Sequence, residues 1–145
     1  MDDIQNIKIQ RLQQHLPLIR KLAGWSATDL GEKIGVSKQT ISSIETKPDY
    51  RMSPTQYLAI RYVIDEEYKN NKVAAKELKN TVDLLVDKGV ELSDEEYQKV
   101  EDAAKTVSEA ASQGVKGDGL KTLAKMVFTL IGAATILGIM ADDEF

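Results

Sequence analysis

Helix starts recur along the chain as one short pattern: an apolar residue, a serine, and a second apolar residue five positions after the first. A serine oxygen at this place accepts a hydrogen bond from a free backbone N–H of the first helical turn, and the two apolar residues pack together as a hydrophobic staple. The four starts predict helices over residues 26–34, 37–46, 53–69 and 93–113. The pattern occurs at Trp25-Ser26 with Leu30, Val36-Ser37 with Ile41, Met52-Ser53 with Tyr57, and Leu92-Ser93 with Tyr97.

Two further segments have apolar residues at helical spacing. The first precedes Gly24 and is interrupted by Pro17, which predicts a kink or a new helix start there. The second covers residues 72–88, where Val73, Leu78, Val82 and Leu85 form one face and Gly89 is expected to close the helix. Glycines 114, 117 and 119 predict a flexible break. Because no stretch alternates apolar and polar residues convincingly, the fold class is all-α.

Composition excludes several kinds of chemistry. The chain has no cysteine and one histidine, so a disulfide framework, a thiolate metal site and a Cys/His nucleophile are ruled out, and the cytoplasm is the expected compartment. We interpret His15 as structural or exposed. The acidic run Asp94-Glu95-Glu96 is explained by the dipole of the helix that begins there. The sequence therefore predicts no enzyme, no metal and no cofactor.

Charge is distributed unevenly along the chain. The formal net charge is -4, but residues 8–61 carry nine Lys/Arg against four acids, whereas residues 71–145 carry nine lysines against fourteen acids. A locally basic half is what binding to nucleic-acid phosphates requires, whatever the charge of the remainder.

The most informative stretch runs from Trp25 to Glu45 and predicts two short helices joined by a glycine turn. Leu30, Ile34, Ile41 and Ile44 supply the inward faces, Gly31 allows a close approach of the two helices, and Gly35 suits a backbone with positive φ. The outer face that remains carries Lys38, Gln39, Ser42 and Ser43. Such side chains can bond base edges in the major groove, although a helical hairpin with a solvated face would show the same pattern.

The string Gly-Val-Ser-Lys-Gln-Thr-Ile-Ser-Ser-Ile-Glu, residues 35–45, resembles the recognition helix of the Cro and lambda-repressor type of helix-turn-helix, the XRE family. The resemblance covers about residues 8–66. It implies a compact DNA-binding domain of four or five helices over residues 1–70. The helical patterns after it predict an appendage over residues 72–145 that serves self-association or attachment. The resemblance also implies that Arg20 and Glu45 form a structural pair, and that the base-contacting residues are Lys38, Gln39, Thr40, Ser42 and Ser43.

Two positions depart from the family pattern. Ala27 stands where the family usually presents a glutamine to a phosphate, and the turn after Glu45, residues 46–51, is long and lacks glycine. We expect the DNA backbone to be contacted instead by Ser26, Thr28, Ser37, Lys47 and Arg51. The family further implies a homodimer on a pseudo-palindromic operator, with recognition helices about 34 Å apart.

The carboxyl-terminal part contains sixteen uncharged residues, 126–141, in a predicted helix over about 120–141. A membrane-spanning helix needs about 20 apolar residues, so the run is slightly short. We favour a buried helix that closes the appendage or forms a dimer core over an anchor at the cytoplasmic face of the membrane. Alanines 103, 104, 110 and 111 offer small faces to receive such a helix.

The sequence thus predicts a sequence-specific regulator that binds double-stranded DNA, acting as a repressor. Two alternatives stay open. One is an antitoxin-like or scaffold protein whose helix-turn-helix binds another protein, which the acidic second half and Ala27 favour. The other is a membrane-tethered regulator.

Overall fold

The computed structural model describes residues 3–129, and all of its regular elements in this range are helical. The elements are α1 (Asp3–Ala23), α2 (Ala27–Ile34), α3 (Lys38–Thr46), α4 (Pro54–Asn70), α5 (Lys76–Val82), a π-helical turn η1 (Asp83–Asp87), a 3-10 turn η2 (Gly89–Glu91) and α6 (Asp94–Ser112). Residues 117–129 form a further helix after α6. The predicted all-α class is confirmed.

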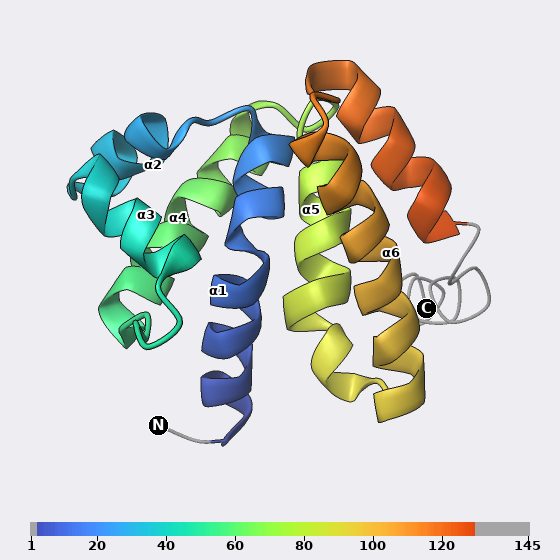
Figure 1. Cartoon of the computed structure of the whole chain (residues 1–145), viewed down its shortest axis with the longest axis horizontal. Helices are drawn as coiled ribbons and strands as arrows, with labels where there is room; N and C mark the ends of the chain where they lie inside the picture. The colour runs from blue at the N-terminus through green and yellow to red at the C-terminus, as the bar shows by residue number, and fades with distance from the viewer. Residues whose placement is uncertain (1–2, 130–145) are drawn as a thin grey trace.

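Helix α1 lies in the middle of the fold (Figure 1), with α2, α3 and α4 on one side and α5, η1 and α6 on the other. Its residues Leu12, Leu16, Ile19 and Leu22 are almost completely buried. They belong to one hydrophobic core that continues from the first four helices into α5 and α6. Helix α1 therefore packs against the helix-turn-helix side and against the α5–α6 side of the described chain, as a wall common to both.

All four predicted serine caps are present. The Oγ atoms of Ser26, Ser37, Ser53 and Ser93 each accept a hydrogen bond from the backbone N–H three residues later. At Ser53 and Ser93 the side chains of Gln56 and Glu96 complete the reciprocal bond to the capping residue. Each cap satisfies backbone groups that would otherwise need water, and so fixes the residue at which the helix begins.

A new helix start at Pro17 is not observed, because α1 continues from Asp3 to Ala23 through this proline. Inside a helix a proline removes one hydrogen bond and brings its ring against the carbonyl four residues earlier. The residues on both sides of it, Leu16 and Leu18, are nevertheless buried in the core. The apolar pattern on both sides of Pro17 thus belongs to a single element.

The predicted helix over residues 72–88 is wrong in its bounds and in its ending. Val73 is 93% exposed, α5 begins only at Lys76, and the chain then widens into the π-helical turn η1 before it tightens into the 3-10 turn η2. Gly89 is not a left-handed helix cap. A Cβ at Gly89 would collide first with the Leu84 carbonyl oxygen and would also come within 2.8 Å of the Tyr97 ring, so the position is glycine because of these two close approaches. The hydroxyl of Tyr97 donates to the Leu85 carbonyl at 2.6 Å.

The predicted flexible break over glycines 114–119 is shorter than expected, because Gly119 lies inside the helix of residues 117–129. Leu120, Ala124 and Phe128 of this helix are buried in the common core. The remainder of the apolar run, residues 130–141, lies outside the described residues. Among residues 3–129, no helix is long and apolar enough to cross a membrane.

The contact between α1 and α6 contains polar groups as well as apolar ones. The guanidinium carbon of Arg11 lies 3.6 Å from the centre of the Tyr97 ring, and Gln14 donates to Glu101 at 3.2 Å. His15 lies on the same helix, one turn after Arg11, and its Nε2 has no hydrogen-bond partner within the described part of the chain. Burial, together with the positive charge of Arg11, lowers the pKa of His15 to about 4.

We predict that His15 makes the fold less stable in weak acid. Below pH 6.5 the unfolded chain binds a proton that the folded chain excludes until about pH 4, so the free energy of unfolding falls as the pH drops between these values. The loss from this group amounts to about 3 kcal/mol. Urea unfolding of the wild type and of His15→Gln from pH 7 to pH 4 measures this loss of stability, because the variant has no imidazole at position 15 to bind the proton. Parallel stability curves for the two proteins would contradict the assignment.

Candidate nucleic-acid interface

Helices α2 and α3 form a tight pair on the outside of α1. Leu30 of α2 and Ile41 and Ile44 of α3 are buried between the helices. A Cβ at Gly31 would come within 2.6 Å of the Val36 carbonyl, so a larger residue would separate α2 from the start of α3. Gly35 has φ 78° and turns the chain between the two helices. The predicted close approach at Gly31 and the predicted positive φ at Gly35 are therefore both present.

The outer face of α3 carries the five residues predicted to contact bases. Lys38 and Gln39 are exposed in the first turn, whereas Thr40, Ser42 and Ser43 are partly buried. The Thr40 hydroxyl lies 3.1 Å from the Oγ of Ser37, so it takes part in the cap of α3. Lys38 and Gln39 are thus the side chains of this set with the most freedom to reach a ligand.

The orientation of α3 is held by Arg20 at the end of α1. Its Nε and Nη2 atoms donate to the two carboxylate oxygens of Glu45 at 2.9 and 3.0 Å, and Nη1 donates to the Trp25 carbonyl at 3.0 Å. The side chains of Arg20 and Glu45 are only 14% and 7% exposed. One guanidinium therefore connects α1, the turn before α2 and the last turn of α3. Because Glu45 is the one acid of α3, no free carboxylate remains on that helix.

The start of α2 has an additional negative charge. Ser26 and Asp29 form a reciprocal capping box, in which each side chain bonds the backbone N–H of the other residue. The Ser26 N–H and hydroxyl hold the pKa of the exposed Asp29 below its usual value. Ser26 and Thr28 are exposed beside this carboxylate. An approaching phosphate would meet Asp29 here as well as the helix N-terminus. The sequence analysis predicted the Ser26 cap but not its acidic partner.

Residues 18–62 match the sequence profile of a family described as Helix-turn-helix. This segment is a helix-turn-helix of the Cro and lambda-repressor type. The matched range covers α2 and α3 completely, together with the end of α1 and half of α4. No curated protein and no solved structure gives a match to the chain.

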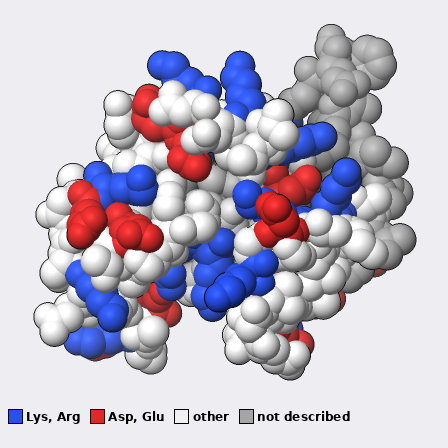
Figure 2. Space-filling model, turned by 90° about the horizontal axis from the view of Figure 1, so that it is seen from above, with Lys and Arg blue, Asp and Glu red and all other residues white. Residues whose placement is uncertain are grey.

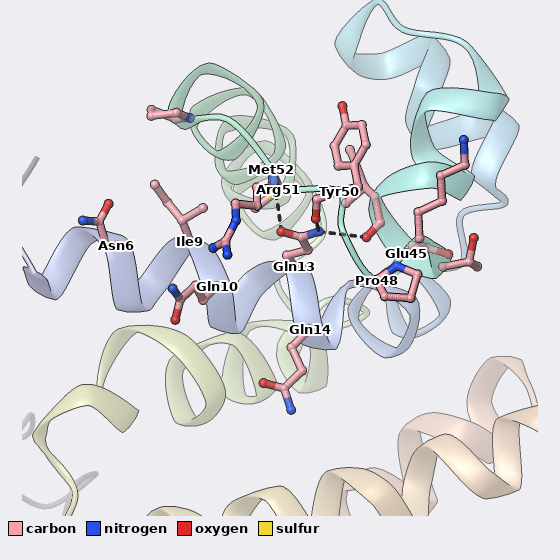
Figure 3. A pocket seen from close by; sticks show the side chains of 14 residues that line it. Asn6, Ile9, Gln10, Gln13, Gln14, Glu45, Pro48, Tyr50, Arg51 and Met52 are labelled. Atoms are coloured by element: carbon pink, nitrogen blue, oxygen red, sulfur yellow. Dashed lines mark hydrogen bonds between the residues drawn. The ribbon is translucent and has the colours of Figure 1, made fainter.

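Gln13 of α1 holds the loop that follows the second helix of the helix-turn-helix. Its Nε2 donates to the carbonyls of Ile44 and Tyr50 at 3.1 and 2.7 Å, and its Oε1 accepts from the Met52 N–H at 2.9 Å. Figure 3 shows the amide reaching from α1 to this loop. The long turn without glycine, which departs from the family pattern, thus has a fixed shape. Sequence reasoning missed Gln13 because its three partners lie 31 to 39 residues away.

A groove of about 730 Å³ lies between α1 and this loop (Figure 3). Lys47 and Arg51 line it, and both are exposed. These two cations are the predicted backbone contacts on this side of α3. The face seen in Figure 2 has a different character, since Lys and Arg are interspersed there with Asp and Glu. The excess of positive charge in residues 8–61 is therefore not a uniform basic surface over that face.

We predict that Gln13→Ala destabilises the fold by about 1–3 kcal/mol, because the loop after α3 loses two hydrogen bonds, the Ile44 carbonyl of α3 loses a third, and these backbone groups are left without partners. Gln14→Ala is the matched control. Gln14 is the adjacent residue, is exposed and makes one bond to Glu101, so its loss should cost about 0.5 kcal/mol or less. Chemical unfolding of both variants measures the difference. Equal costs would show that Gln13 does not organise the loop.

Proposed function

We propose that this protein is a sequence-specific regulator of transcription that binds double-stranded DNA through α3 and acts as a repressor. The observation that carries the proposal is the outer face of α3. It is polar, it begins with exposed Lys38 and Gln39, and its single carboxylate is tied to Arg20 on the inner side. An α-helix with such a face fits the major groove of B-DNA.

The residue types on this face suit base recognition. A glutamine amide pairs bidentately with adenine, a lysine ammonium donates to guanine, and a serine hydroxyl bonds either base. Gln39 and Lys38 supply the first two groups, and the partly buried Ser42 and Ser43 lie one turn further along α3. We therefore assign base specificity chiefly to Lys38 and Gln39. The two serines would contact a base only where the DNA approaches α3 more closely.

Phosphate contacts are expected on both sides of α3, with unequal strength. Lys47 and Arg51 carry positive charge on the loop after α3, whereas Ser26 and Thr28 stand beside the carboxylate of Asp29 at the start of α2. Ser37 caps α3 itself, and the remaining free N–H groups of a helix N-terminus favour a bound phosphate. Because the α2 side is the weaker one, a second protomer on the same operator would add much to affinity.

A homodimer on a pseudo-palindromic operator is part of the proposal, with recognition helices about 34 Å apart. Leu58 and Tyr62 support self-association. They are four residues apart on α4, so they share one face, and they are 60% and 65% exposed. Neighbouring exposed apolar side chains of this size are more common at interfaces than on free surfaces.

We predict that Gln39→Ala relaxes base preference at one position of the operator and weakens its binding by about 1–3 kcal/mol. The substrate is a duplex selected by the full chain from a random pool, and fluorescence anisotropy measures affinity for it and for its single-base variants. Gln98→Ala on α6 is the matched control and should bind like the wild type. Equal affinity of the wild type for all sequences would contradict the proposal and favour the protein-interaction alternative.

A further inference from the structure

A second groove lies where the helix-turn-helix meets the appendage, and Ser26 is the one of its lining residues that the proposed function uses. One wall is the junction of α1 and α2, with Lys21, Trp25 and Ser26. The other wall is the turn between α6 and the helix of residues 117–129, with Ala111, Val115 and Lys116. Figure 1 shows the two junctions near each other at the upper end of the molecule. The volume of this junction groove is about 580 Å³, which is within the range of small-molecule sites.

The interior of the junction groove is largely apolar and open. Its remaining lining residues are glycines, and a Cβ built on Gly24, Gly114 or Gly117 would meet no other atom within 4 Å. Val115 is 37% exposed, so part of its side chain lacks a covering group. A flat apolar group placed here would cover Val115 and the edge of Trp25 and would displace water from both.

The charges at the junction groove have one sign. Lys21 and Lys116 stand on opposite walls, both are exposed, and no carboxylate is among the described residues that line the groove. The occupant with matching chemistry has an apolar ring system and a negative group. A bare phosphate backbone would use the lysines but would gain nothing from the apolar interior.

We propose that the junction groove binds a small aromatic anion, with its ring system against Trp25 and Val115 and its anionic group between Lys21 and Lys116. The ligand would touch both halves of the chain, and so would stabilise their packing by mass action. It would also cover Ser26. If the proposed function holds, on which this last step rests, the ligand competes with DNA at the start of α2 and acts as an effector.

Trp25 is the single tryptophan of the chain, so its fluorescence reports on this groove. The probe is anilinonaphthalene sulfonate, an aromatic anion that accepts energy from tryptophan, titrated into the full chain. We expect saturable quenching of Trp25 at one site and a higher Tm, because the probe binds the folded state. Its uncharged analogue, N-phenylnaphthylamine, should bind about fivefold more weakly, because it forms no ion pair with the lysines.

Substitutions locate the site. Lys21→Gln and Lys116→Gln should each weaken binding of the sulfonate about two- to threefold and leave the uncharged analogue unaffected. Lys33→Gln is the matched control, because Lys33 lies 5.1 Å from the Trp25 ring but does not line the groove. Equal effects of all three substitutions, no preference for the anion, or a lowered Tm would overturn the proposal, the last because it indicates binding to a loosened chain.

The two proposals fail separately. Binding of the sulfonate as described by a chain that binds no duplex DNA would overturn the proposed function and keep the groove as a ligand site. Sequence-specific DNA binding without saturable quenching would overturn the ligand site and keep the proposed function. If Lys116→Gln weakened DNA binding but left the sulfonate unaffected, the lysine would be a phosphate contact and the ligand proposal would be wrong.

Discussion

The contact on which the interface depends is the bidentate pair between Arg20 and Glu45, together with the bond from Arg20 to the Trp25 carbonyl. Both side chains are mostly buried, and loss of one partner would leave the other charged in a poorly solvated place, at a cost of about 3–5 kcal/mol. The pair sets the angle of α3 and removes its only carboxylate from the outer face. The surface offered to DNA is therefore a consequence of an interior contact.

Helix α1 also positions most of the other elements, because helices pack against it on two sides. Gln13 holds the loop after α3, Arg20 holds α3 itself, and Arg11 and Gln14 contact α6. A change in the packing of α6 against α1 would thus be transmitted to the helix that supports the helix-turn-helix. This shared wall gives a physical reason for a ligand at the junction groove to affect DNA binding, although the groove lies outside α3.

Features that depend on neighbours in sequence were predictable. The serine caps, the left-handed Gly35 and the inward residues of α2 and α3 follow from spacings of at most five residues, and the structure has them all. Among the features that depend on distant partners, the Arg20–Glu45 pair was predicted only through the family resemblance, and the others were not predicted. Gln13 looks like any polar residue on α1, and Gly89 looks like a helix end until Tyr97 is placed on it. The close contacts between the two halves of the chain were missed for the same reason.

The central claim is that α3 and its flanking turns are the surface that meets DNA. Amide chemical shifts of the full chain, recorded while duplex DNA is added at low salt, test it most directly, because even non-specific binding uses the same surface. The account predicts shifts concentrated at residues 37–43 and 47–51, with smaller ones at residues 26–28. Shifts confined to α5, η1 and α6, or no shifts at all, would contradict it.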